Sequence, residues 1–171
     1  MIGDLAMDSG AILSPCGKYR YKLWRRWDES LPPAVYIMLN PSTADAFTDD
    51  PTITRCIARA MNHLPVRAGG IVVVNLFAYR ETDSSLLPQL HRAGVDLLGP
   101  DNDYWLMDAV KGAAITICAW GKCGVLGERA GIVRSKLRQA GHVVHALRIG
   151  KNGQPEHPLY IGYDVKPEVF I

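Results

Sequence analysis

The sequence predicts an α/β fold, a three-layer α/β/α sandwich around a central four-stranded parallel sheet. From residue 34 onward, short runs rich in valine and isoleucine alternate with segments whose apolar residues recur at helical spacing. The runs are continuously apolar, which is typical of strands that helices cover on both faces. Because crossovers between parallel strands are right-handed, few other topologies suit this alternation.

The first strand is expected at residues 35–39 and the first helix at residues 51–63. Asp50 suits the N-cap of that helix, and Pro51 suits its first position. Between the two elements lies the turn-rich stretch NPSTADAFTDDP. This loop exceeds the roughly 2 to 6 residues typical of such connections, and long loops of this kind are often functional.

The second and third strands are expected at residues 71–74 and 114–119. Between them, the apolar spacing predicts a helix at residues 101–111. The side chains that this helix is expected to bury are Trp105, Leu106, Ala109 and Val110.

An amphipathic helix is expected at residues 128–140, with Ile132, Val133 and Leu137 facing the core. A fourth strand should follow at residues 142–147. The tail after residue 150 contains too many glycines and prolines for regular structure.

The segment KYRYKLWRRW, at residues 18–27, precedes the first parallel strand. Basic and apolar side chains alternate in it, so a strand would separate them onto two faces: Lys18, Arg20 and Lys22 on one, and Tyr19, Tyr21 and Leu23 on the other. The pattern predicts an antiparallel edge strand protected by charge. Basic residues interleaved with aromatic ones can also follow a phosphate backbone and stack on bases.

Composition limits the classes of function. The 171 residues predict one domain spanning residues 1–171, and the net charge of +2 is too small for a broad DNA-binding surface. The four cysteines form no metal-binding pattern, so free thiols, no metal and no cofactor are expected. With no apolar run long enough for a membrane and no secretory leader, the sequence predicts a cytoplasmic protein without membrane partners, of unknown oligomeric state.

Unusual polar and aromatic residues follow each predicted strand. The carboxyl ends of parallel strands meet at one edge of a sheet, where ligands of open α/β sheets bind. We therefore expect one pocket at that edge, surrounded by residues from four separate segments: Asn40 and Ser42, Asn75, Trp120 and Gly121, and His157.

Three aspartates lie in the long loop before the first helix. Asp50 is expected to cap the helix, whereas Asp45 and Asp49 are either turn-forming residues or functional carboxylates.

Six strings between residues 39 and 160 carry a family resemblance: LNPSTAD, DDPTITRC, VVNLFAYR, GPDND, AWG and GQPEHPLY. They resemble the signature of a bacterial and phage family catalogued as a domain of unknown function. More distantly, the order of the motifs is similar to that of the uracil-DNA glycosylase superfamily, whose fold is a four-stranded parallel sheet between helices.

The distant resemblance implies a role for each strand-end motif. Asn40 before Pro41 corresponds to the asparagine that places the attacking water in the mismatch-specific branch. Asn75 corresponds to the asparagine that recognises the uracil edge, and His157 to the histidine that steadies the departing base. The string Ala-Trp-Gly at residues 119–121 is similar to the Leu-Trp-Gly that ends the third strand there.

Two departures concern DNA contacts and the pocket wall. Leu159 and Tyr160 replace the Ser-Pro pair that helps to pinch DNA, and Ser42 replaces a bulky tyrosine of the main branch.

Hydrolysis of an N-glycosidic bond suits these residue types, since it needs a positioned water and donors for the charge that builds on the base. The predicted catalytic residues are Asn40, His157 and Asp49, with Asp45 as the other candidate carboxylate. The predicted substrate-binding residues are Ser42, Asn75, Phe77, Trp120 and Gly121, and either Phe77 or Phe47 would stack on the base.

The sequence therefore predicts a nucleobase-processing enzyme, an N-glycosidase resembling DNA glycosylases, with DNA or a nucleotide as partner. The alternative is a non-catalytic reader of a modified base or nucleotide. A third hypothesis is an enzyme acting on another phosphorylated substrate. The sequence has no glycine-rich phosphate-binding fingerprint, which counts against this hypothesis.

Overall fold

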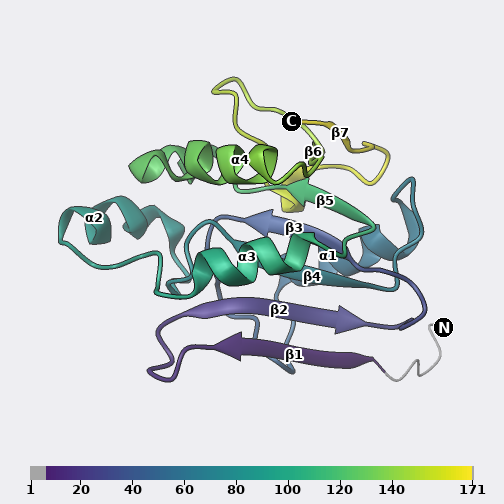
Figure 1. The fold of residues 1–171 in the computed structure, drawn as a ribbon, viewed down its shortest axis with the longest axis horizontal. Helices are drawn as coiled ribbons and strands as arrows, with labels where there is room; N and C mark the ends of the chain where they lie inside the picture. Colours follow the sequence, from purple (N-terminus) through teal and green to yellow (C-terminus); the bar gives the residue numbers. More distant parts are fainter. Residues whose placement is uncertain (1–6, 171) are drawn as a thin grey trace.

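A computed structural model describes residues 7–170 as a mixed α/β fold built on one seven-stranded sheet. The strands lie in the order β1-β2-β4-β3-β5-β6-β7 (Figure 1). Their bounds are Asp8–Leu13 for β1, Arg20–Arg26 for β2, Ala34–Met38 for β3, Gly70–Asn75 for β4, Ile115–Cys118 for β5, His145–Ala146 for β6 and Glu168–Val169 for β7. The predicted α/β class is confirmed, but the sheet has seven strands, more than the four parallel strands and the one antiparallel edge strand that the sequence indicated.

The four strands in the middle of the sheet are parallel, and those flanking them are antiparallel. β3 pairs in parallel with β4 on one side and β5 on the other, and β5 pairs in parallel with β6. Met38 at the end of β3 lies opposite Asn75 at the end of β4. The carboxyl ends of the two central strands therefore lie next to each other.

Helices cover both faces of the sheet (Figure 1). The bounds are Pro51–Asn62 for α1, Leu87–Arg92 for α2, Asn102–Val110 for α3 and Arg129–Gln139 for α4, with short 3-10 helices η1 at Ser84–Leu86, η2 at Lys122–Glu128 and η3 at Pro158–Tyr160. One core cluster joins α3 and α4 to one face of the sheet, and a second joins α1 to the other face. None of the helices in residues 7–170 is both long enough and apolar enough to cross a membrane.

The start of α1 confirms the predicted cap. The Asp50 carboxylate accepts a hydrogen bond of 2.9 Å from the amide of Ile53, and Pro51 occupies the first turn. Ile53, Cys56 and Ala60 face the sheet and are buried. This cap fixes where the long loop after β3 ends.

Three expectations about the strands were wrong. The strand from the KYRYKLWRRW segment is antiparallel as predicted, but it is not at the edge, because β1 pairs with β2 on its outer side. The strand predicted at residues 142–147 is reduced to β6, whose two residues are His145 and Ala146. The tail also contributes β7, which pairs antiparallel with β6.

Two buried positions on the helices were also predicted incorrectly. Ile132 is 44% exposed, and Ala130 packs into the core together with Val133 and Leu137. Trp105 is only half-buried, and the Lys22 ammonium lies 5.8 Å from the centroid of its ring.

The cysteines are free thiols, as predicted. Cys56 and Cys118 are buried, Cys123 is half-buried and Cys16 is exposed.

Candidate functional site

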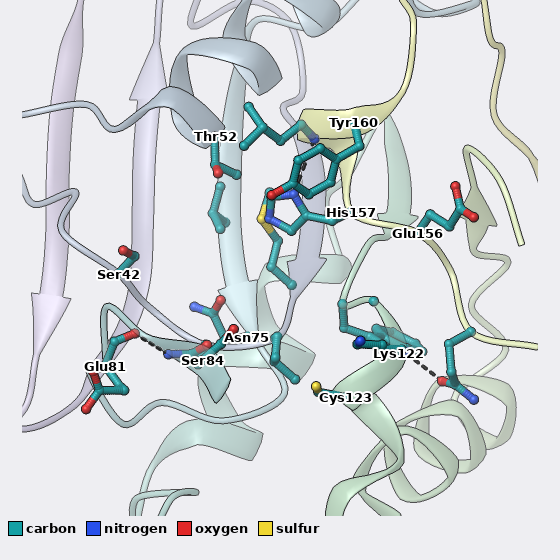
Figure 2. A pocket seen from close by; sticks show the side chains of 18 of the residues that line it. Ser42, Thr52, Asn75, Glu81, Ser84, Lys122, Cys123, Glu156, His157 and Tyr160 are labelled. Carbon is teal, nitrogen blue, oxygen red and sulfur yellow. Dashed lines mark hydrogen bonds between the residues drawn. The ribbon is translucent and has the colours of Figure 1, made fainter. Parts of the chain in front are cut away.

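A pocket of about 840 Å³ lies at the carboxyl ends of β3, β4 and β5 (Figure 2). Its wall is drawn from β2, the loop after β3, the segment at residues 81–84, the start of η2 and the segment at residues 150–160. Six of the eight site residues predicted from the sequence line it: Asn40, Ser42, Asn75, Trp120, Gly121 and His157. The two that do not are Asp49 and Phe77.

Asn75 lies at the centre of the sheet edge, at the last position of β4. It is 1% exposed, and its side-chain nitrogen Nδ2 has no hydrogen-bond partner among the described residues. A buried amide donor without a partner costs free energy in the unliganded protein. Asn75 therefore has the property expected of a group reserved for a ligand.

The backbone at Asn75 and Leu76 is held by side chains from α3 and α4, on the face of the sheet that these two helices cover. Asn102, at the start of α3, donates from Nδ2 to the carbonyl oxygens of Asn75 and Leu76 at 2.9 and 3.1 Å. Arg129, at the start of α4, donates to the Leu76 carbonyl at 2.8 Å and forms an ion pair with Asp103. These bonds satisfy carbonyl groups that the sheet leaves free, and they fix the end of β4.

Asn40 lies two residues after the end of β3 at Met38, and its side-chain amide is oriented by two hydrogen bonds. Nδ2 donates to the backbone carbonyl of Pro41 at 3.0 Å and to that of Glu81 at 2.8 Å. Because both N–H groups of the amide are used, the remaining hydrogen-bonding atom is its acceptor oxygen. Asn40 can therefore accept a hydrogen bond from a water or from a ligand hydroxyl.

His157 is held in one tautomer by the turn that it begins. It is the N-cap of η3, and its Nδ1 accepts from the amide of Leu159 at 3.3 Å (Figure 2). Burial lowers the pKa of His157, and the charge of Asp50 opposes this only in part. The neutral ring therefore carries its proton on Nε2, where it is a hydrogen-bond donor.

Trp120 and Gly121 form the wall of the pocket beyond β5. Trp120 is 1% exposed, belongs to the core and donates from Nε1 to Gln154 Oε1 at 2.8 Å. Gly121 has a φ of 72°, which turns the chain into η2. At the opening, Tyr160 is 79% exposed and its ring centroid lies 5.8 Å from that of His157 (Figure 2).

The three loop aspartates have different surroundings. The Asp45 carboxylate accepts from the amides of Phe47 and Thr48, which lowers its pKa. The Asp49 carboxylate forms an ion pair of 2.8 Å with the buried Arg25. Asp50, the helix cap, is the aspartate of this loop that lines the pocket.

Neither predicted stacking aromatic lines the pocket. Phe77 is 5% exposed and packs in the core under α3 and α4. Phe47 is 90% exposed on the loop. The aromatic residues that do line the pocket are Trp120 and Tyr160.

Sequence reasoning missed several pocket residues, of which Arg20 is the most unusual. It is 2% exposed and lines the pocket, and burial lowers its pKa to about 10. The other polar lining residues that were missed are Thr52, Glu81, Thr82, Ser84, Lys122, Lys151, Asn152, Gln154 and Glu156. The basic character of Arg20 was visible in the sequence, but its alternating neighbours indicated a surface position.

The pocket offers neutral hydrogen-bonding groups near its centre and charged groups around them. Within the described residues, no three His, Cys, Asp or Glu side chains gather closely enough to hold a metal ion together. The arrangement can bind a planar polar ligand through amide and imidazole groups, and it can position a water through Asn40.

No curated protein and no solved structure shows significant similarity to the chain. A family model matches residues 20–159, a span that contains all the pocket residues named above except Tyr160. The chain therefore belongs to the family described as Protein of unknown function (DUF1643).

Proposed function

We propose that the pocket binds a nucleobase and that the protein hydrolyses the bond between this base and its sugar. The observation that carries the proposal is the buried Nδ2 of Asn75, which lines the pocket and has no hydrogen-bond partner among the described residues. A side-chain amide offers a donor and an acceptor side by side, as the edge of a pyrimidine does. A base bound there satisfies the amide that the protein leaves unsatisfied.

His157 supplies a second contact to the base in this proposal. Its Nε2–H donates to a ring carbonyl, and the bond from the Leu159 amide to Nδ1 keeps the proton on Nε2. The charge that develops on a departing base is stabilised by donors that are already oriented. Asn75 and His157 are such donors.

In the proposed step, Asn40 accepts a hydrogen bond from a water held against the anomeric carbon. The water oxygen bonds to this carbon while the bond from the carbon to the base nitrogen breaks, through an oxocarbenium-like state. The electron pair stays on the base, and one proton of the water ends on the released base. The products are a free base and a sugar with a new hydroxyl group.

The order of the motifs supports this assignment, because its resemblance to the uracil-DNA glycosylase superfamily implies water, base and leaving-group roles for Asn40, Asn75 and His157. The proposal omits Asp49, since its carboxylate is paired with Arg25 and lies outside the pocket wall. Asp50 is the loop aspartate that lines the pocket.

A non-catalytic reader of a modified base is the second candidate. Each of the three loop aspartates is already engaged, Asp45 by backbone amides, Asp49 by Arg25 and Asp50 by the Ile53 amide. A base-binding pocket whose loop aspartates are all engaged in this way suits recognition without cleavage.

The proposal is tested by titrating nucleosides and base-modified single- and double-stranded oligonucleotides into the wild type and three variants. Asn75→Ala should weaken binding by about 5- to 150-fold, because it removes a contact worth roughly 1 to 3 kcal/mol. Asn62→Ala, on the exposed end of α1, is the matched control and should bind as the wild type does.

Release of the free base, measured by chromatography, distinguishes an N-glycosidase from a non-catalytic reader. For an N-glycosidase, Asn40→Ala should slow release more than it weakens binding. Binding without release identifies a reader. If the folded wild type binds no member of the panel, or if Asn75→Ala binds as well as the wild type, the base-binding proposal is wrong.

A further inference from the structure

Arg20 differs from the other buried arginines of the chain. Four arginines are at most 5% exposed: Arg20, Arg25, Arg59 and Arg129. Arg25 and Arg129 each form an ion pair with an aspartate, and Arg59 donates to three backbone carbonyls. Arg20 lines the pocket, whereas the other three do not.

The guanidinium of Arg20 has few partners among the described residues. Its Nη1 donates to the backbone carbonyl of Ala44, and its Nε has no partner. No carboxylate of residues 7–170 forms an ion pair with it. A buried charge without a counter-charge is costly, so such a group is normally paired.

The charged groups around Arg20 offset its charge only in part, since neither nearby aspartate forms an ion pair with it. Asp50 and Asp45 are the acids that act on it, and Arg80 and Arg25 are the bases. Both aspartates use a carboxylate oxygen for backbone amides, Asp50 for Ile53 and Asp45 for residues 47 and 48. Arg20 also lines the pocket, so an anion bound in the pocket can reach its guanidinium.

A phosphate group suits this position. Guanidinium groups bind phosphate through parallel N–H bonds, and the unpaired Nε of Arg20 is one such donor. The first turn of α1 also lines the pocket with Thr52 and Ile53, but the Asp50 carboxylate already accepts from the Ile53 amide, so the phosphate site depends on Arg20.

We propose that Arg20 binds the phosphate of the ligand, so that the ligand of the pocket is a nucleotide with a terminal phosphate and not a nucleoside or free base. This inference rests on the proposed function for the identity of the base, while the anion site itself depends only on Arg20. Because Arg20 is 2% exposed, a phosphate must enter the pocket to reach its guanidinium. A terminal phosphate enters a pocket more easily than an internal one, because the strand continues on both sides of an internal phosphate.

The experiment compares nucleoside 5′-monophosphates with the corresponding nucleosides, using the wild type, Arg20→Met and Arg20→Gln. The wild type should bind the nucleotides about 10- to 100-fold more tightly, as charge-assisted hydrogen bonds imply. Both variants should bind nucleosides as the wild type does and lose the preference for nucleotides. Dinucleoside monophosphates, whose phosphate is internal, are titrated as well. They test whether the site prefers a terminal phosphate to the internal phosphate of a strand.

The unfolding temperature without ligand distinguishes an anion site from a structural role, because the two roles predict opposite effects of Arg20→Met on this temperature. If Arg20 is reserved for an anion, Arg20→Met should keep or raise the unfolding temperature, because it removes an unpaired buried charge. Arg129→Met is the matched control and should lower this temperature, since it removes the hydrogen bond to the Leu76 carbonyl and leaves Asp103 with Lys136 as its remaining ion-pair partner. If both Arg20 variants fail to fold, Arg20 is structural and the inference is wrong.

Inorganic phosphate and pyrophosphate distinguish failure of this inference from failure of the proposed function. If no nucleoside or nucleotide binds, but either anion stabilises the wild type and not Arg20→Met, the anion site stands and the base assignment is wrong. If nucleosides and nucleotides bind the wild type equally, the anion site is wrong and the base assignment stands. If dinucleoside monophosphates bind as tightly as mononucleotides, the terminal-phosphate assignment is wrong.

Discussion

His157 gives the pocket a pH dependence whose sign follows from its burial. Its pKa lies below the ordinary value of 6.5 in the folded chain, because burial disfavours the imidazolium. The unfolded chain binds the proton more readily, so folding stability is retained above about pH 6.5 and is lost as the pH falls below that value. Protonation at Nδ1 also removes the bond from the Leu159 amide.

We expect the unfolding temperature of the wild type to fall more steeply between pH 7 and pH 5 than that of His157→Gln. The other four histidines of the chain are present in both proteins, so the difference between the curves reports His157 alone. Base binding by the wild type should stay constant from pH 8 to pH 6.5 and weaken only below it. Parallel unfolding curves for the two proteins would contradict this account.

At the residue scale, the polar groups at strand ends were predictable and Arg20 was not. Asn40, Asn75 and His157 follow buried apolar runs, and parallel strands bring such positions to one edge. Arg20 was expected on a polar face, because alternation along a strand separates it from Tyr21. The pairing of β1 with β2 shifts register at Leu13, which lies opposite Arg20, and both Arg20 and Tyr21 are buried. A bulge of this kind redirects side chains, and nothing in the local sequence marked it.

At the element scale, η2 depends on a glycine that leaves room for Trp120. A Cβ atom added at Gly124 would lie 2.2 Å from Cδ1 of Trp120 and 2.6 Å from its Nε1. Trp120 is buried and its Nε1 is bonded to Gln154, so the indole cannot move without loss. We expect Gly124→Ala to destabilise the fold by about 1 to 3 kcal/mol, the usual cost of overpacking a core.

Gly131 in α4 is the matched control for this substitution. No atom lies within 4 Å of a Cβ added there, and alanine favours the helix by about 0.5 to 1 kcal/mol. Gly131→Ala should therefore raise the denaturant midpoint of unfolding, while Gly124→Ala lowers it. Equal midpoints for the two variants would show that η2 can move away from Trp120.

The long elements were predictable and the short ones were not. The helices α1, α3 and α4 and the strands β3, β4 and β5 lie where periodicity and caps indicated, within a few residues. β6 and β7 have two residues each, too few for a periodic signal. β1 reads DSGAIL, and the glycine in it is a poor strand residue. Gly10 is required there by tertiary packing, since an added Cβ would meet the ring of Trp24.

At the scale of the whole molecule, the pocket joins segments that are far apart in the chain. Arg20 and Tyr160 are both part of its wall, and between them lie the ends of three parallel strands. The topology made this convergence predictable, but the antiparallel contribution of β2 depends on a strand order that local sequence patterns do not encode. A ligand in this pocket contacts several elements at once and should stabilise them together.

This arrangement predicts the response of hydrogen exchange to a bound nucleotide. A ligand at 100 times its Kd adds about 2.7 kcal/mol to the free energy of global unfolding. Amides that exchange by global unfolding, in β3, β4 and β5, should therefore slow by about 100-fold. Amides in the pocket segments at residues 40–50, 81–84, 120–124 and 150–160 should slow as well, because their local opening breaks the site.

The helix α2 does not line the pocket, so its amides, which open locally, should exchange at an unchanged rate. Asn75→Ala under the same ligand concentration is the control and should lose most of the protection. Slowing confined to one of the four segments would show that the ligand binds that segment alone and does not fill the pocket.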